Sequence, residues 1–140
     1  MEAGGSLKIL LDTSVLIDIL KGRPETIGKI EGLKNRSEFY TSSVNVYEIL
    51  RGIRSIKVKV DQKAHTIAFD TLLVNLKVLN FDIESSEKAS WIYSDLKQKG
   101  IKIDENDYLI AGIYLSNGID AIITRDRHFE SITQLKTIRC

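Results

Sequence analysis

The sequence predicts an α/β domain in which a mainly parallel sheet of about five strands is covered by helices on both faces. Short apolar runs bounded by turn residues alternate along the chain with segments of helical periodicity. Two of the runs contain wholly apolar stretches, at residues 9–11 and 121–123, as in strands buried on both faces. A length of 140 residues suits one compact domain. We therefore expect a single domain over residues 7–140 after a flexible tail at residues 1–6.

The strand and helix segments follow one another in strict order. The expected strands cover residues 7–12, 38–41, 76–81, 121–124 and 135–139. The expected helices cover residues 14–21, 25–34, 43–55, 61–74, 85–99 and 104–117. Ser42 or Ser43 can cap the third helix, and Ser85 or Ser86 starts the fifth, while Gly100 and Gly118 end the last two.

Composition indicates a globular protein of the cytoplasm. Hydrophobic residues make up 43% of the chain and charged residues 28%. No apolar run approaches the roughly 20 residues of a membrane span. The single cysteine, Cys140, excludes an internal disulfide and a cysteine-based zinc site. A net charge of +1 neither requires nor excludes nucleic acid, because local basic clusters matter more than the total.

Four acidic residues beside apolar segments carry the strongest functional signal. They are Asp12, Glu48, Asp107 and Asp126. Asp12 and Asp126 lie at the C-termini of expected strands, at the edge where parallel sheets bind ligands. Carboxylates beside a core are costly unless they are paired, hydrogen-bonded or bound to a cation. If the fold brings these four together, a hard divalent metal is their natural partner, and phosphodiester hydrolysis in RNA is the expected reaction.

Each acid also has a purely structural interpretation. Asp12 suits the N-cap of the next helix, and Asp126 suits a turn. Glu48 can be a solvated side chain that pairs with Arg51 one helical turn later. The functional interpretation is therefore favoured only by the order in which the four acids occur together along the chain.

The segment before the last long helix has a structural alternative of its own. Asp104 and Asp107 are spaced as in a capping box, although Asp107 shares a face with apolar residues that we expect to be buried. His65 and His128 match no metal-ligand spacing, so we expect them to be surface or packing residues. No P-loop, GxGxxG, GxSxG or HExxH pattern occurs.

In their joint order, four motifs resemble those of the PIN-domain nucleases, and most closely the VapC-like ribonuclease toxins of type II toxin–antitoxin systems. The motifs lie at residues 10–17, 46–52, 107–112 and 123–129. The resemblance implies a three-layer α/β/α PIN domain. Gly112 stands where the family commonly has alanine, a mild departure.

The resemblance also implies roles for individual residues. The catalytic set is Asp12, Glu48, Asp107 and Asp126, of which Asp12, Asp107 and Asp126 hold Mg²⁺ or Mn²⁺. Supporting residues are Thr13, Ser14, Asp104 and Thr124, and the candidates for RNA binding are Arg51, Arg54, Arg125 and Arg127. The implied partners are RNA, a small VapB-like antitoxin and a second copy of the chain, with no membrane.

Three other functions compete with the ribonuclease toxin. A PIN nuclease that acts in RNA processing or on DNA is the nearest, because a fold does not determine its substrate. A non-catalytic α/β binding module, whose acids only cap helices, predicts no specific binding of Mg²⁺ or Mn²⁺. A receiver-like phosphoacceptor domain requires an acidic pair after the first strand, where the chain has Asp12, Thr13 and Ser14.

Overall fold

A central sheet of five parallel strands organises the chain, which a computed structural model describes over residues 6–140. The strand order is β3-β2-β1-β4-β5, and each neighbouring pair is parallel. The strands are β1 (Leu7–Leu11), β2 (Ser37–Ser42), β3 (Lys77–Leu79), β4 (Ala121–Thr124) and β5 (Thr137–Arg139). The predicted α/β class and the number of strands are confirmed.

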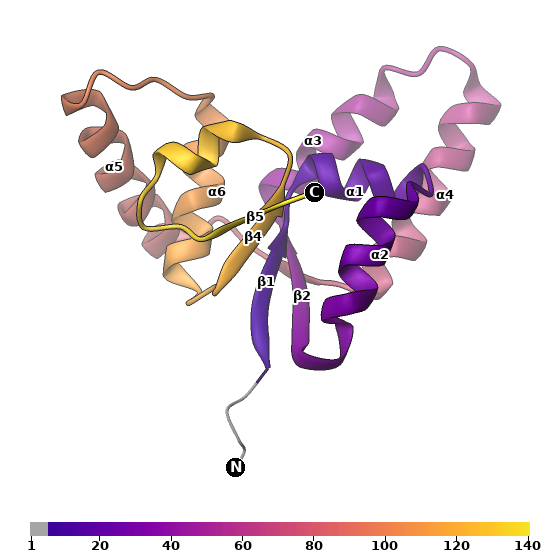
Figure 1. Cartoon of the computed structure of the whole chain (residues 1–140). Helices are drawn as coiled ribbons and strands as arrows, with labels where there is room; N and C mark the ends of the chain where they lie inside the picture. The colour runs from indigo at the N-terminus through magenta and orange to yellow at the C-terminus, as the bar shows by residue number, and fades with distance from the viewer. Residues whose placement is uncertain (1–5) are drawn as a thin grey trace.

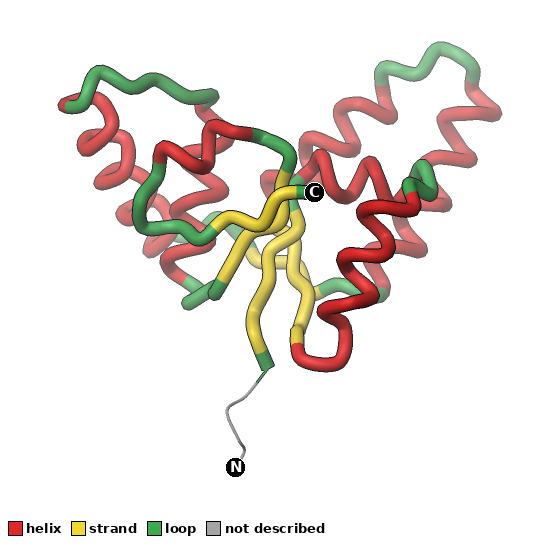
Figure 2. Tube along the Cα trace, in the orientation of Figure 1, coloured by secondary structure: helices red, strands yellow, loops and turns green. Residues whose placement is uncertain are grey.

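Helices cover both faces of this sheet, so the domain has three layers (Figure 1). The helices are α1 (Thr13–Leu20), α2 (Pro24–Leu33), α3 (Ser43–Arg54), α4 (Lys59–Val74), α5 (Ile83–Gln98) and α6 (Glu105–Ser116). Helices α1 to α4 gather on one side of the strands, and α5 and α6 lie on the other (Figure 2). No helix within residues 6–140 is long and apolar enough to cross a membrane.

The two faces of the sheet bury two separate clusters of side chains. Successive strand residues point to opposite faces. Leu10 and Ile122 accordingly pack with the α5 and α6 side chains. Ile9, Leu11 and Ile123 pack with α1, α3 and α4. Because the central strands are buried on both faces, their buried residues are mostly apolar. This pattern is why the sequence predicts these strands well.

Helices α5 and α6 are tightly packed at Gly112. A Cβ added there would clash with the backbone oxygen of Ser85 and would lie 2.8 Å from the Ala89 Cβ atom. The departure from alanine at this position therefore has a steric reason, since the contact between these helices leaves no room for a methyl group.

Some expected boundaries are wrong. Helix α5 begins at Ile83 rather than Ser85, because the Asp82 side chain caps it by accepting a hydrogen bond of 2.9 Å from the Ser85 N–H. Two 3-10 helices, η1 (Lys34–Arg36) and η2 (Arg127–Ser131), were not expected. The predicted flexible tail falls mainly on residues 1–5, which lie outside the described part of the chain.

Candidate active site

The candidate site lies at the carboxyl ends of the two central strands. Strand β1 pairs with β2 on one side and with β4 on the other, so the strand order changes direction there. Asp12 directly follows β1, and Thr124 is the last residue of β4. Ligands bind in parallel α/β sheets at such a point, where the loops on either side diverge.

Asp12 is buried and held by side chains from two other segments. Its Oδ1 atom accepts a hydrogen bond of 3.0 Å from Asn45 Nδ2, and its Oδ2 atom accepts one of 2.6 Å from Thr124 Oγ1. The side chain makes no capping hydrogen bond to α1, so the N-cap interpretation does not account for it. Burial is the main cause that raises the pKa of Asp12 to about 6.

Glu48 faces the same site from helix α3. Its Oε1 atom accepts a hydrogen bond of 2.5 Å from Thr13 Oγ1, and its Oε2 atom accepts one of 3.1 Å from Asn106 Nδ2. Arg51, the expected partner of a solvated Glu48, lies instead over the Tyr47 ring, at 5.2 Å from its centroid. Glu48 is thus directed toward α1 and α6 by the polar residues around it.

Asp107 and Asp126 meet at the imidazole of His128. His128 Nδ1 lies 3.1 Å from Asp107 Oδ2 and 3.4 Å from Asp126 Oδ1. Burial first, and the charge of Asp126 second, raise the pKa of Asp107 to about 7. The hydrogen bond to Asp107 raises the pKa of His128. Asp126 also accepts a hydrogen bond of 2.8 Å from the His128 N–H, which orients its carboxylate.

Comparison with known proteins identifies the family of this site. The family model for the PIN domain matches residues 9–135. The chain belongs to the PIN-domain family.

Its relatives within the PIN family are VapC proteins, as the motifs predict. The chain is 27% identical over 130 residues to the tRNA(fMet)-specific endonuclease VapC of Salmonella typhimurium, covering 93% of this chain and 96% of that protein. It is 31% identical over 127 residues to ribonuclease VapC1 of Methanocaldococcus jannaschii, covering 91% and 82%. The structure of DNA-bound VapBC from Salmonella typhimurium superposes with a TM-score of 0.83 at 25% identity, over 95% of this chain and 98% of that chain.

In this PIN domain the fourth motif is fixed to α1 by polar contacts. Ser14 Oγ accepts a hydrogen bond of 3.0 Å from the Arg125 N–H, and Thr124 Oγ1 accepts one of 2.9 Å from the Asp126 N–H. The Arg125 guanidinium lies 3.1 Å from the buried carboxylate of Asp18. Arg125, predicted to bind RNA, is therefore also a structural partner of α1.

The other predicted RNA-binding residues lie on the surface. Arg51 and Arg54 are exposed on the last turns of α3, and Arg127 is exposed at the start of η2. Glu48 lies on the same helix as the first two, and Asp126 directly precedes the third. Both positions place a basic side chain beside an acidic site, and their role in binding RNA stays a prediction.

Sequence reasoning missed three residues of this PIN site. Asn45 and Asn106 orient Asp12 and Glu48, and His128 contacts Asp107 instead of only packing on the surface. Each had a signal in the sequence. Asn45 precedes Glu48 by one helical turn, Asn106 directly precedes Asp107, and His128 follows Asp126 by two residues.

The donor set fits a divalent cation. Within residues 6–140, neither Asp12 nor Asp107 pairs with a lysine or arginine, although both are buried. Carboxylate oxygens are the ligands that Mg²⁺ and Mn²⁺ prefer in proteins. Burial raises the pKa of both acids, as expected for carboxylates that no full positive charge of a lysine or arginine offsets.

Proposed function

We propose that this PIN protein is a metal-dependent endoribonuclease that acts as the toxin of a toxin–antitoxin pair. The observation that carries the proposal is the pair of buried carboxylates, Asp12 and Asp107, at the carboxyl end of a parallel sheet, neither of which pairs with a lysine or arginine in residues 6–140. Relatives named ribonuclease VapC and tRNA(fMet)-specific endonuclease VapC support RNA as the substrate. A cytoplasmic location stays a prediction.

In the proposed mechanism, Asp12, Asp107 and Asp126 hold Mg²⁺ or Mn²⁺, directly or through water. When bound, the cation supplies Lewis-acid chemistry, activating water and offsetting charge at the scissile phosphate. Thr124 and Asn45 fix both oxygens of Asp12, so this carboxylate is oriented before the substrate arrives. Glu48, held by Thr13 and Asn106, either joins the ligands or orients the attacking water.

The partner we propose is a VapB-like antitoxin. The Salmonella structure that this chain resembles is a VapBC complex. An apolar pocket of about 220 Å³ lies between α1 and α3 beside Glu48, and its apolar side chains include Ile17, Leu20, Ile49, Ile53 and Ile56. An apolar segment of an antitoxin seated there would approach the catalytic acids. A homodimer stays a prediction.

Cleavage of a mixed pool of tRNA, rRNA fragments and single-stranded DNA tests the proposal. The protein is assayed with Mg²⁺, with Mn²⁺ and with chelator, next to Asp107→Asn and a control, Asp70→Asn, whose side chain is exposed on α4. We expect RNA cleavage that requires metal and is lost in Asp107→Asn only. Cleavage of DNA alone supports the competing DNA nuclease, and cleavage that persists with chelator contradicts the metal mechanism.

A further inference from the structure

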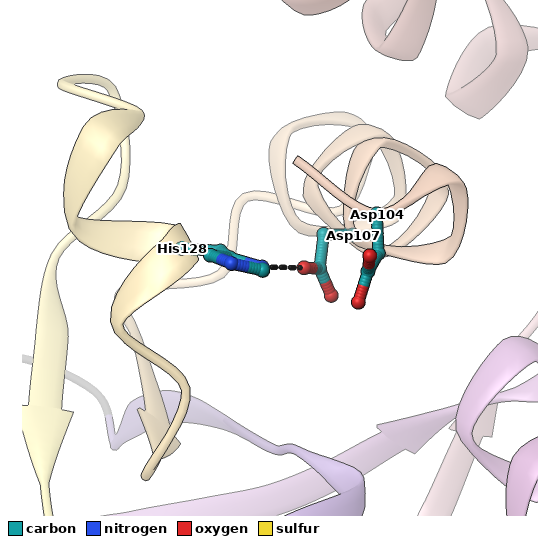
Figure 3. Close-up of side chains that lie close together, drawn as sticks. All are labelled: Asp104, Asp107 and His128. Carbon is teal, nitrogen blue, oxygen red and sulfur yellow. Dashed lines mark hydrogen bonds and ion pairs between the residues drawn. The ribbon is translucent and has the colours of Figure 1, made fainter. Parts of the chain in front are cut away.

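The acidic site extends on its α6 side into a group of potential ligands that shares Asp107 with it. Asp104, Asp107 and His128 each offer one ligand atom, and these atoms all lie within 4.8 Å of one another. Figure 3 shows the three side chains, with the two aspartates at the start of α6 and the imidazole facing them from η2. We call these three residues the Asp-Asp-His cluster.

The carboxylates of this cluster do not cap the helix on which they lie. Asp104 occupies the N-cap position of α6, but its side chain makes no capping hydrogen bond, contrary to the capping-box interpretation. Asp107 is only 6% exposed, and its Oδ1 atom accepts no hydrogen bond from any residue in 6–140. Within residues 6–140 the buried side-chain atoms without a partner are Asp18 Oδ1 and Ser37 Oγ, so Asp107 Oδ1 reaches solvent and is free to bind a cation.

The spacing within the cluster suits direct coordination. Two ligands on adjacent corners of an octahedral site, with bonds of about 2.1 Å, lie roughly 3 Å apart. The distance between His128 Nδ1 and Asp107 Oδ2 is 3.1 Å. The same nitrogen lies 3.4 Å from Asp126 Oδ1, so a cation bound here would also be within reach of the catalytic acids.

We propose that His128 supplies a nitrogen ligand, together with Asp104 and Asp107, to a divalent cation, and that this subsite selects Mn²⁺ over Mg²⁺. The proposal rests on the proposed metal-dependent function and names the preferred ion of that same site. Mg²⁺ takes oxygen ligands almost exclusively, whereas Mn²⁺ and later transition ions also accept imidazole. An all-carboxylate site would lack this basis for selection.

The competing explanation is that His128 is only a counter-charge to Asp107 and Asp126. In that case the imidazole forms ion pairs and moves away when a cation enters. The two explanations differ in one observable, because only a ligand places a ¹⁴N nucleus in direct contact with the bound Mn²⁺.

Pulsed electron paramagnetic resonance of the full chain loaded with Mn²⁺ tests the proposal. We expect a ¹⁴N modulation of the Mn²⁺ echo that changes to a ¹⁵N pattern with ¹⁵N-histidine and disappears in His128→Gln. His65→Gln is the matched control, since His65 is an exposed histidine of α4 that contacts the Asp61 carbonyl. This control should keep the nitrogen signal.

Titration calorimetry gives the second readout. In His128→Gln we expect the Kd for Mn²⁺ to rise about tenfold or more and the Kd for Mg²⁺ to change by less than about threefold. Mn²⁺ binding without nitrogen coupling overturns the inference and leaves the metal-dependent function standing. Absence of any Mn²⁺ binding, together with cleavage that needs no metal, overturns both.

Discussion

Three aspartates are buried in the described part of the chain, and they differ in the charge of their neighbours. They are Asp18, Asp12 and Asp107. Asp18 is 1% exposed, while Asp12 and Asp107 are 5% and 6% exposed. Asp18 Oδ1 lies 3.2 Å from Arg23 Nε and 3.1 Å from a terminal nitrogen of Arg125, at ion-pair distance though without hydrogen-bond alignment. Asp18 Oδ2 accepts a hydrogen bond of 2.7 Å from Thr26 Oγ1.

This difference distinguishes a structural acid, which is paired with arginines, from two acids that have no lysine or arginine partner in residues 6–140. Two guanidinium groups compensate the charge of Asp18 within the folded chain. Asp12 receives only neutral donors, and Asp107 receives one imidazole. Since a buried charge must be compensated, we expect the second pair to take a cation from solution. Burial alone therefore does not mark the active site, whereas burial without internal cations does.

Replacement of Asp12 by Asn should give the largest effect of the variants considered. This effect should fall on the rate of cleavage and not on stability. We expect the rate of RNA cleavage to fall by about 1,000-fold, which corresponds to about 4 kcal/mol of activation free energy. The free energy of unfolding with chelator at pH 8 should stay the same or rise, because the variant removes an uncompensated buried charge. Single-turnover cleavage and urea denaturation measure the two quantities. A large loss of stability would place Asp12 in the same class as Asp18.

Replacement of Asp18 by Asn should have the opposite pattern. We expect the free energy of unfolding to fall by about 1–2 kcal/mol, because two solvent-screened ion pairs and the charged acceptor of the Thr26 hydroxyl are lost together. Urea denaturation of the two variants side by side makes the comparison, with Asp70→Asn as an exposed control. If Asp18→Asn is as stable as the wild type, the two arginines do not compensate a buried charge and the contrast fails.

The sequence predicted the sheet and the acidic quartet but not the partners that distinguish these acids. The central strands are recognisable because both faces are buried, so that residues 9–11 and 121–123 are apolar throughout. The four acids were singled out because their motifs occur in order, and their catalytic role stays a prediction. The pairing of Asp18 with Arg125 joins residues 107 positions apart, and no local pattern encodes such a contact. His128 is exposed, as the sequence predicts, but its contact with Asp107 joins residues 21 positions apart.

The pH dependence of stability offers a second way to test the comparison. Asp12 and Asp107 have raised pKa values, so the folded protein binds more protons than the unfolded chain between about pH 4 and pH 7. The raised pKa of His128 acts in the same direction near neutral pH. Without metal, we therefore expect stability to fall by about 2 kcal/mol as the pH rises from 5 to 8.

Thermal unfolding with chelator at pH 5 and pH 8 measures this loss. Addition of Mn²⁺ should remove most of it, because the cation binds the ionised carboxylates of the folded state. The lowered pKa of Asp82 acts in the opposite direction but only at more acid pH. Stability that rises from pH 5 to pH 8 in the absence of metal would show that the acidic site is compensated internally.

The smallest effects should come from the two arginines that share Asp18. Their side chains are 51% exposed in Arg23 and 44% exposed in Arg125, so solvent screens each pair. We expect Arg23→Ala and Arg125→Ala each to reduce the free energy of unfolding by less than about 1 kcal/mol. Urea denaturation should therefore not distinguish the two variants.

Cleavage kinetics should distinguish them, because only Arg125 adjoins the catalytic loop. Its backbone N–H bonds to Ser14, and Asp126 is the next residue. If Arg125 positions Asp126, Arg125→Ala lowers kcat several-fold while KM stays near the wild-type value. If Arg125 instead binds RNA, KM rises and its dependence on salt weakens, since one phosphate contact is lost. Arg23→Ala should leave both constants unchanged, and an equal loss of kcat in both variants would assign the effect to Asp18 itself.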